Sequence, residues 1–342
     1  MNTIVVPLDG SELAEQALPL AGTIATKRKA ELVLTTAIAT GDRWVDGMGR
    51  RWQAEEQAAV ESYLRTIVER LKQKRVPARA RVDWGRPHIV IGTVADQEDA
   101  DFIVMTTHGR SGVSRWTMGS IADKVLRTTS RPLILIHATT HARVPENVQR
   151  ILVPLDGSEL AEAALPQAEQ FARSMSASLV LVRAVVPPAI LYTGEFVPGD
   201  LPDLEGLEAA ANAYLDRTAE PIRERGLQVG VAVGVGVPAE VILNVCRDHG
   251  ANLIVMTTHG RSGVDRWMFG SVADAVVRHV RLPVLVVPSR VKPAEEEPAG
   301  IPMAGNAVVP PPALTETEQV APSPEMRWPK PRTRRPERSP GR

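Results

Sequence analysis

The 342-residue sequence is poor in cysteine and aromatic residues and carries no formal net charge. A single cysteine, Cys246, excludes an intramolecular disulfide and fits a reducing compartment. Forty basic residues balance forty acidic ones, so no global charge attracts nucleic acid or an anionic membrane. The longest apolar runs have the length of a strand, well short of the roughly 18 residues of a membrane-spanning helix. We therefore expect a cytoplasmic protein without a transmembrane segment.

Neither a secretion signal nor a reactive thiol is expected. An apolar strand pattern begins by Thr3, with no basic segment ahead of it. Cys246 continues the helical pattern of residues 240–245, where a small thiol packs as a hydrophobic side chain. We interpret Cys246 as a core residue rather than a nucleophile. No cluster of cysteine and histidine suggests a zinc site.

The chain contains an internal repeat of domain size. Asp9 in residues 4–15 matches Asp156 in residues 151–162, an offset of 147, whereas His108 matches His259, an offset of 151. A period near 150 residues indicates a duplicated domain rather than a solenoid. We predict a first domain over residues 1–140 and a second over 148–289. We place most of the extra length in the loop over residues 186–206.

The composition changes after the second copy. Residues 290–342 are rich in proline and show no sustained apolar periodicity, so we expect a disordered tail. Its end, residues 327–335, is basic. That end is either a solvated tail or a weak electrostatic docking site for an acidic partner, a membrane surface or nucleic acid.

Strand and helix patterns alternate within each copy. The first copy predicts strands at residues 4–8, 31–38, 79–84, 101–105 and 133–137, and helices at 12–26, 52–74, 88–99 and 120–128. Pro19 is expected to kink the first helix. Such alternation implies a parallel sheet with helices on both faces. The predicted fold class is therefore α/β, with two tandem Rossmann-like domains, each a five-stranded parallel sheet.

A glycine-rich loop follows the fourth strand of each copy. In the first copy it runs from Thr106 through His108, Gly109, Arg110 and Gly112, and then reaches Gly119 and Ser120 at a helix start. Glycines let backbone N–H groups approach an anion, and a helix start favours phosphate. The loop thus favours a phosphate site, unless its glycines only make a tight strand–helix connection.

The rest of a nucleotide site would come from the other strand ends. Asp9 and Ala37 also fall at carboxyl ends of strands, where open α/β sheets bind ligands. A carboxylate at Asp9 suits a ribose hydroxyl or a metal-bound water. The glycine spacing matches neither a Walker loop nor a dinucleotide fingerprint.

These motifs resemble those of the universal stress protein family, in its tandem, ATP-binding type. The family's Pro-x-Asp-x-Ser strand end is matched at Pro7, Asp9 and Ser11, and again in the second copy. The glycine motif is matched from Gly109 to Gly119 and Ser120, and likewise in the second copy. The resemblance covers about residues 1–289 and implies an adenine nucleotide alpha hydrolase-like (HUP) fold. Thr106 and Thr257 replace the motif's first glycine, which narrows the approach for a phosphate.

The resemblance implies a site for ATP, with Mg²⁺ carried by the nucleotide, in each copy. Adenine and ribose would lie at the first two strand ends and the phosphates at the loop. The implied residues of the first copy are Pro7, Leu8, Asp9, Ser11, Ala37, Thr106, His108, Gly109, Arg110, Gly112, Gly119 and Ser120. Those of the second copy are Pro154, Leu155, Asp156, Ser158, Ala184, Thr257, His259, Gly260, Arg261, Gly263, Gly270 and Ser271. Arg183 replaces the equivalent of Thr36, so the second pocket differs at its rim.

Three functions fit these observations. The first is a stress-response regulator that binds ATP with little or no turnover and has no catalytic residues. The second is a slow ATPase or phosphotransferase that uses His108 and His259. The third is a nucleotide-independent scaffold that recruits a partner through the basic tail. The resemblance also implies an intramolecular pseudo-dimer in which Leu133–Ile136 pairs with Val284–Val287, and leaves a homodimer open.

Overall fold

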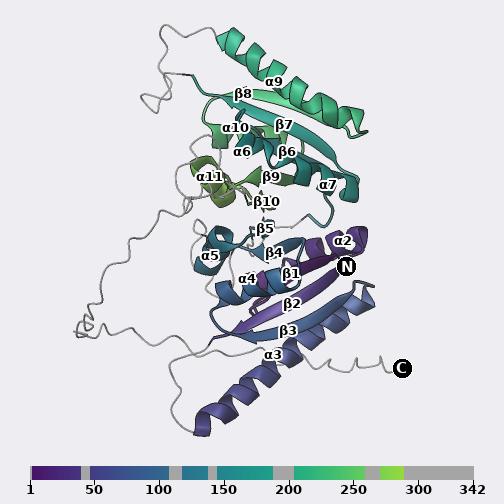
Figure 1. Cartoon of the computed structure of the whole chain (residues 1–342), viewed down its shortest axis with the longest axis vertical. Helices are drawn as coiled ribbons and strands as arrows, with labels where there is room; N and C mark the ends of the chain where they lie inside the picture. The colour runs from purple at the N-terminus through teal and green to yellow at the C-terminus, as the bar shows by residue number, and fades with distance from the viewer. Residues whose placement is uncertain are drawn as a thin grey trace, which may run out of the picture. The chain divides into compact units, whose positions relative to one another are not determined.

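The structure is a computed structural model that describes residues 2–39, 47–107, 118–137, 145–187, 204–258 and 270–288, without the side chains of residues 47–53. In the first copy the elements are β1 (Thr3–Pro7), α1 (Glu12–Glu15), α2 (Leu18–Arg28), β2 (Glu31–Ile38), α3 (Gly47–Gln73), β3 (Ala78–Trp84), α4 (Pro87–Gln97), β4 (Phe102–Thr106), α5 (Ser120–Thr128) and β5 (Leu133–Ile136) (Figure 1).

The second copy repeats this order. Its elements are β6 (Arg150–Pro154), α6 (Glu159–Glu162), α7 (Leu165–Met175), β7 (Ser178–Val185), α9 (Leu204–Glu224), β8 (Val229–Val235), α10 (Pro238–Asp248), β9 (Leu253–Thr257), α11 (Ser271–His279) and β10 (Val284–Val287). The predicted alternation of strands and helices is confirmed in both copies.

The prediction of one helix over residues 12–26 is wrong, because two helices occupy this stretch. α1 ends at Glu15, and α2 begins at Leu18 with Pro19 in its first turn. A proline is tolerated there because a first-turn N–H has no partner within the helix. Pro166 takes the same place in α7. The proline therefore starts a new helix instead of bending a continuous one.

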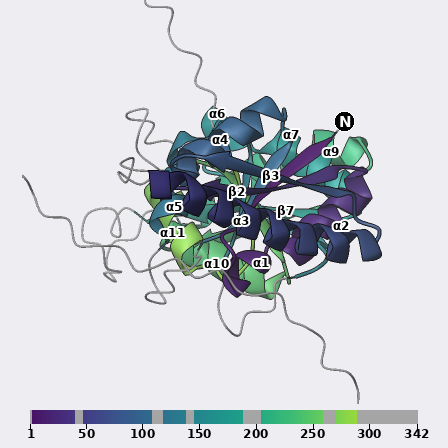
Figure 2. The ribbon, with the colours of Figure 1, turned by 90° about the horizontal axis from the view of Figure 1, so that it is seen from below.

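The ten strands in the described part of the chain form one sheet, in the order β3-β2-β1-β4-β5-β10-β9-β6-β7-β8. Neighbours within each copy are parallel, and helices lie on both faces of the sheet (Figures 1 and 2). β5 and β10 are antiparallel, with Val284 opposite Leu135 and Val286 opposite Leu133. The last strands thus join two five-stranded parallel sheets into one.

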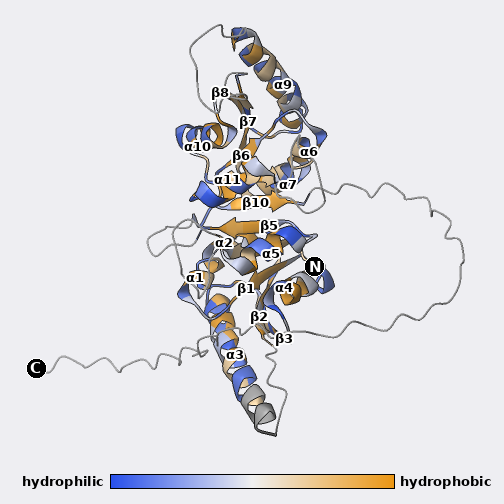
Figure 3. Cartoon of the chain, turned by 90° about the vertical axis from the view of Figure 1, so that its left-hand side faces the viewer, coloured by the Kyte–Doolittle hydropathy of each residue, from blue (hydrophilic) through white to orange (hydrophobic). Residues whose placement is uncertain are grey.

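The inner strands are apolar and mostly buried, as expected for a sheet covered on both faces, whereas the edge strands β3 and β8 contain no buried residue. The hydropathy colouring shows β5 and β10 as hydrophobic strands lying next to one another (Figure 3). One cluster of buried side chains extends through both copies and includes Val5, Ile103, Leu135, Ile254 and Val284. The core is therefore continuous across the β5–β10 pair.

A second contact between the copies is formed by side chains of α2 and β4 in the first copy and by α7 in the second. The ring of Phe102 in β4 meets the ring of Phe171 in α7 edge to face, with centroids 5.7 Å apart, and both are fully buried. The guanidinium of Arg28 lies over Phe102, 4.8 Å from the ring centroid. Lys27 donates a hydrogen bond of 2.8 Å to the carbonyl of Met175. This aromatic contact joins the two copies independently of the strand pair.

Contacts divide the chain into residues 1–289 and 290–342, and the second unit lies outside the described residues. The predictions of a disordered tail and of a basic docking segment therefore stay predictions. Within the ranges that the structure covers, no helix is long and apolar enough to cross a membrane.

We predict that the contact between Phe102 and Phe171 stabilises both copies together. Phe171→Ala should lower the free energy of unfolding by about 3–5 kcal/mol, because it leaves a cavity in a closely packed site. Phe171→Leu keeps most of the volume and should cost less than about 1.5 kcal/mol. Urea unfolding followed by circular dichroism measures both. A loss below 1 kcal/mol for the alanine variant would contradict this role.

Candidate functional site

The strand order of each copy reverses at its first strand. The chain places β2 and β3 on one side of β1, and then β4 and β5 on the other. β1 and β4 pair only at Ile4–Phe102 and Val5–Ile103, so their carboxyl ends are not paired with each other. The second copy shows the same two-pair ladder between β6 and β9. Ligands of open α/β sheets bind at this switch point.

Proline contributes to this divergence. β1 ends at Pro7 and β6 ends at Pro154, and a proline has no N–H to offer to a neighbouring strand. The chain then leaves the sheet through Asp-Gly-Ser turns. Gly10 and Gly157 lie in the left-handed region, with φ of 83° and 86°, which side-chain-bearing residues adopt only with strain. The turn therefore depends on glycine.

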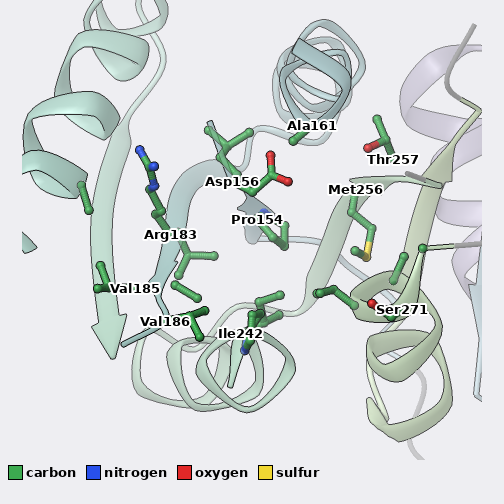
Figure 4. A pocket seen from close by; sticks show the side chains of 18 of the residues that line it. Pro154, Asp156, Ala161, Arg183, Val185, Val186, Ile242, Met256, Thr257 and Ser271 are labelled. Atoms are coloured by element: carbon green, nitrogen blue, oxygen red, sulfur yellow. The ribbon is translucent and has the colours of Figure 1, made fainter. Parts of the chain in front are cut away.

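A pocket of about 490 Å³ occupies the crevice of the second copy (Figure 4). Its size lies in the range of small-molecule sites. It is formed by the carboxyl ends of β6, β7 and β9 and by α9, α10 and the start of α11. Most of its walls are apolar, and Asp156 and Arg183 are the charged side chains among the described lining residues. Such a pocket suits a largely planar, partly polar ligand.

Asp156 is held in a fixed orientation. Its Oδ1 atom accepts hydrogen bonds from the backbone N–H of Ser158 at 2.9 Å and from the Ser158 hydroxyl at 2.6 Å. The same hydroxyl accepts from the N–H of Ala161 and caps α6. Asp9 and Ser11 repeat the arrangement in the first copy, at 3.0 and 2.6 Å. The carboxylate is thus presented at the strand end by the turn that follows it.

A helix start forms the opposite wall of the pocket. α11 begins at Ser271 with Gly270 as its N-cap, and no side chain caps it. The N–H of Gly270 donates to the carbonyl of Thr258 at 2.9 Å, and Gly119 bonds Thr107 in the same way at 2.8 Å. These bonds close the base of each glycine-rich loop. They bring the helix start, which favours a phosphate, next to the end of the fourth strand.

The structure brings together most of the predicted residues that it describes in the second copy. The lining residues include Pro154, Leu155, Asp156, Ala184, Thr257, Gly270 and Ser271. Thr257 is buried, so the residue that replaces the motif glycine lies in the wall. The loop residues lie outside the described residues: His108, Gly109, Arg110 and Gly112 in the first copy, and His259, Gly260, Arg261 and Gly263 in the second.

The two serines that were predicted as site residues, Ser11 and Ser158, stabilise the turns. Ser158 is not among the residues that line the pocket, and its hydroxyl bonds Asp156 and the α6 backbone. Ser11 does the same for Asp9 and α1. Both serines therefore act on the site through the aspartate that they orient.

In the first copy, the remaining predicted residues occupy the equivalent places. Leu8 is buried, and its N–H donates a hydrogen bond of 2.8 Å to the carbonyl of Thr35. Pro7 and Asp9 are half-buried at the end of β1. Ala37 lies in β2, Thr106 ends β4, and Ser120 begins α5 after Gly119. Both copies thus present the same strand ends and the same helix start.

Several lining residues were not predicted from the sequence. They come from α9, α10 and the second half of β7: Val182, Val185, Leu207, Ala210, Ala211, Pro238 and Ile242. Nothing in their own sequence marks them, because they are ordinary apolar positions of helices and strands. A comparison of the two copies gives one signal of a difference in the pocket wall, namely Arg183 at the position of Thr36.

Cys246 belongs to the core. The side chain is 4% exposed in α10, and burial raises the pKa of its thiol to about 12. The interpretation as a small packing residue is confirmed. Burial thus disfavours the thiolate that a nucleophile would need.

The fold and the pocket define a tandem α/β protein with two Rossmann-like units in a mostly parallel sheet. The profile of the universal stress protein family matches residues 1–137 and 147–288. The universal stress protein YxiE of Bacillus subtilis is 33% identical over 149 residues, which cover 40% of this chain and 97% of that protein. The chain belongs to the universal stress protein family.

Two further comparisons agree with this assignment. The universal stress protein Rv2005c of Mycobacterium tuberculosis is 27% identical over 188 residues, which cover 55% of this chain and 62% of that protein. This chain therefore spans less than two thirds of the length of that relative. A crystal structure of a universal stress protein from Archaeoglobus fulgidus has a TM-score of 0.66 at 22% identity, covering 84% of this chain and 98% of that one. That likeness shows the fold.

The burial of Cys246 yields a prediction about its reactivity. At pH 8 the native protein should react with 5,5′-dithiobis(2-nitrobenzoic acid) much more slowly than a free thiol, because burial disfavours the thiolate. Unfolding in guanidinium should release the full signal of one thiol per chain. Rapid labelling of the native protein would contradict the core assignment.

Proposed function

We propose that this chain is a stress-response regulator that binds ATP, with Mg²⁺ carried by the nucleotide, in one or both copies. The observation that carries the proposal is the pocket at the β6–β9 switch point. There an oriented carboxylate, Asp156, faces the start of α11 at Gly270 and Ser271 across an apolar cavity. This combination suits a ligand with a flat apolar part, hydroxyl groups and phosphates.

Each part of the nucleotide has a complementary wall. Val185, Val186 and Ile242 offer apolar surface to the adenine ring. Asp156 accepts a hydrogen bond from a ribose hydroxyl, because its carboxylate stands at the strand end. The Ser271 hydroxyl and the free N–H groups of the first turn of α11 donate to the phosphates. Bound Mg²⁺ would neutralise part of the phosphate charge.

We propose slow turnover or none. Hydrolysis needs a positioned base and groups that stabilise the charge of the transition state. Asp156 is the one carboxylate among the described lining residues, and its Oδ1 is engaged by Ser158. A carboxylate committed to a turn and to the ribose is poorly placed to activate a water at the γ-phosphate. Binding without rapid hydrolysis suits a sensor of nucleotide level.

Calorimetric titration with MgATP tests the binding. The full chain should bind at millimolar ATP or below. The double variant Gly119→Val, Gly270→Val should lose affinity at least tenfold, because the new side chains fill the phosphate end of each pocket. Gly230→Val is a matched control, since it adds the same side chain to β8, where a β-branched residue suits a strand. Absence of binding by the unaltered chain would contradict the proposal.

Phosphate release tests the slow turnover. With saturating MgATP, we expect release far below about 1 s⁻¹, the lower end of ordinary phosphotransfer rates. The released phosphate can be followed with a coupled colorimetric assay. Turnover at or above that rate, lost in the double glycine variant, would overturn the regulatory interpretation in favour of an enzyme.

A further inference from the structure

The two copies differ in charge at one position of the site. Thr36 in β2 pairs with Val82, and Arg183 in β7 pairs with Val233, so the two residues occupy equivalent places in the sheet. Thr36 is 4% exposed, and its hydroxyl donates to the carbonyl of Leu8 at 2.7 Å. Arg183 is half-buried and lines the pocket instead. The second copy therefore has a pocket cation that this position of the first copy lacks.

The Arg183 guanidinium is held beside the Asp156 turn. It stacks on the ring of Tyr214 in α9, with 4.7 Å between its central carbon and the ring centroid. A Cβ atom added at Gly157 would lie 3.3 Å from its Nη2 atom. Gly157 directly follows Asp156, so the guanidinium lies next to the turn that orients the carboxylate, and both residues line the pocket (Figure 4).

The stacking partner is itself fixed. The Tyr214 hydroxyl donates to Oε1 of Glu162 at 2.7 Å. Burial and the neighbouring Glu162 carboxylate raise the pKa of Tyr214 above its ordinary value, so the phenol stays protonated and keeps this bond. The ring is thus anchored at its outer end, and one of its faces supports the guanidinium.

The first copy has an equivalent tyrosine–glutamate pair, but a different cation accompanies it. Tyr63 donates to Glu15 at 3.1 Å, and Arg70 from α3 forms an ion pair with Glu15 at 2.6 Å. The position equivalent to Arg70, at the offset of 151 that also relates Tyr63 to Tyr214, is Pro221 in α9. The first copy therefore has its cation on the helix surface, and the second has it in the pocket wall.

The chemistry of a stacked guanidinium defines the ligand group. Stacking on Tyr214 uses a face of the guanidinium and leaves the N–H donors at its edge, which match an oxyanion in a forked geometry. Among the described residues, Arg183 forms no ion pair with a carboxylate. Its donors are therefore available to an anionic ligand in the pocket.

The place of Arg183 in the sheet decides which anion it meets. β6 lies between β7 and β9, so Arg183 and the Gly270–Ser271 helix start stand on opposite sides of Asp156. If the helix start binds the 5′-phosphates and Asp156 binds the ribose, then Arg183 lies beyond the ribose. In dinucleotide sites, an arginine near the residue that holds the ribose accommodates a phosphate on the ribose ring.

We propose that Arg183 makes the second pocket selective for adenine nucleotides that carry a phosphate on the 2′ or 3′ oxygen of the ribose. This inference rests on the proposed function, because it requires an adenine nucleotide in this pocket. The two copies then have different ligand preferences within one chain: the first has Thr36 where the second has the cation, and the second recognises an additional phosphate.

Calorimetric titration of the full chain tests the proposal. The probes are adenosine 5′-monophosphate, adenosine 2′,5′-bisphosphate and adenosine 3′,5′-bisphosphate. One of the bisphosphates should bind the second site at least about tenfold more tightly than the monophosphate, as expected for hydrogen bonds between charged groups. Arg183→Gln should abolish this preference, so that the bisphosphates bind no more tightly than the monophosphate. Arg183→Lys keeps the charge without the fork and should restore only part of the preference.

Arg70→Gln is the matched control. It removes the same charge from the first copy, but from the helix surface, where Arg70 is 53% exposed, and should leave the preference intact. An equal loss of mono- and bisphosphate affinity in Arg183→Gln would overturn the proposal, because Arg183 would then contact the 5′-phosphates or the base. Binding of ATP and monophosphate without any bisphosphate preference would also overturn it. Binding of no adenine nucleotide would instead refute the proposed function itself.

Discussion

The site depends on the separation of two neighbouring strands at the centre of each copy. β1 and β4 share a ladder of only two residue pairs, and so do β6 and β9. The strand order reverses between them, so the connections of these strands leave on opposite faces of the sheet. Pro7 and Pro154 end the inner strands without an N–H to offer a neighbour. The opening is therefore a consequence of topology rather than of any single side chain.

The second general constraint is the antiparallel pair of β5 and β10. A parallel sheet has two edges, and unpaired backbone groups at an edge are open to association with other chains. Here the last strand of each copy covers the last strand of the other, and Phe102 and Phe171 add an aromatic contact between α7 and β4. Because the two copies are separate stretches of one chain, a residue of one site can be exchanged while the equivalent residue of the other copy stays the same. Thr36 and Arg183 show such a change.

Much of the fold and part of the site could be predicted from local sequence. Short-range rules determine the Asp-Gly-Ser turns, in which Ser11 and Ser158 bond an aspartate two residues away and cap a helix. They also determine the helix starts at Ser120 and Ser271. The exact helix count escaped prediction, because a periodic apolar pattern does not show whether a proline bends a helix or begins a new one. Pro19 and Pro166 begin new ones.

The sequence by itself determined the duplication, the alternating elements and the turn residues, because each of these depends on neighbours within one or two turns of chain. The family resemblance already implied the pairing of β5 with β10 that joins the two sheets. Only the tertiary structure decided that α9 and α10 complete the pocket. It also decided that Arg183 stacks on Tyr214, thirty-one positions later in the sequence, with its guanidinium beside Gly157. Contacts between such distant residues follow from how strands and helices pack, which no local pattern encodes.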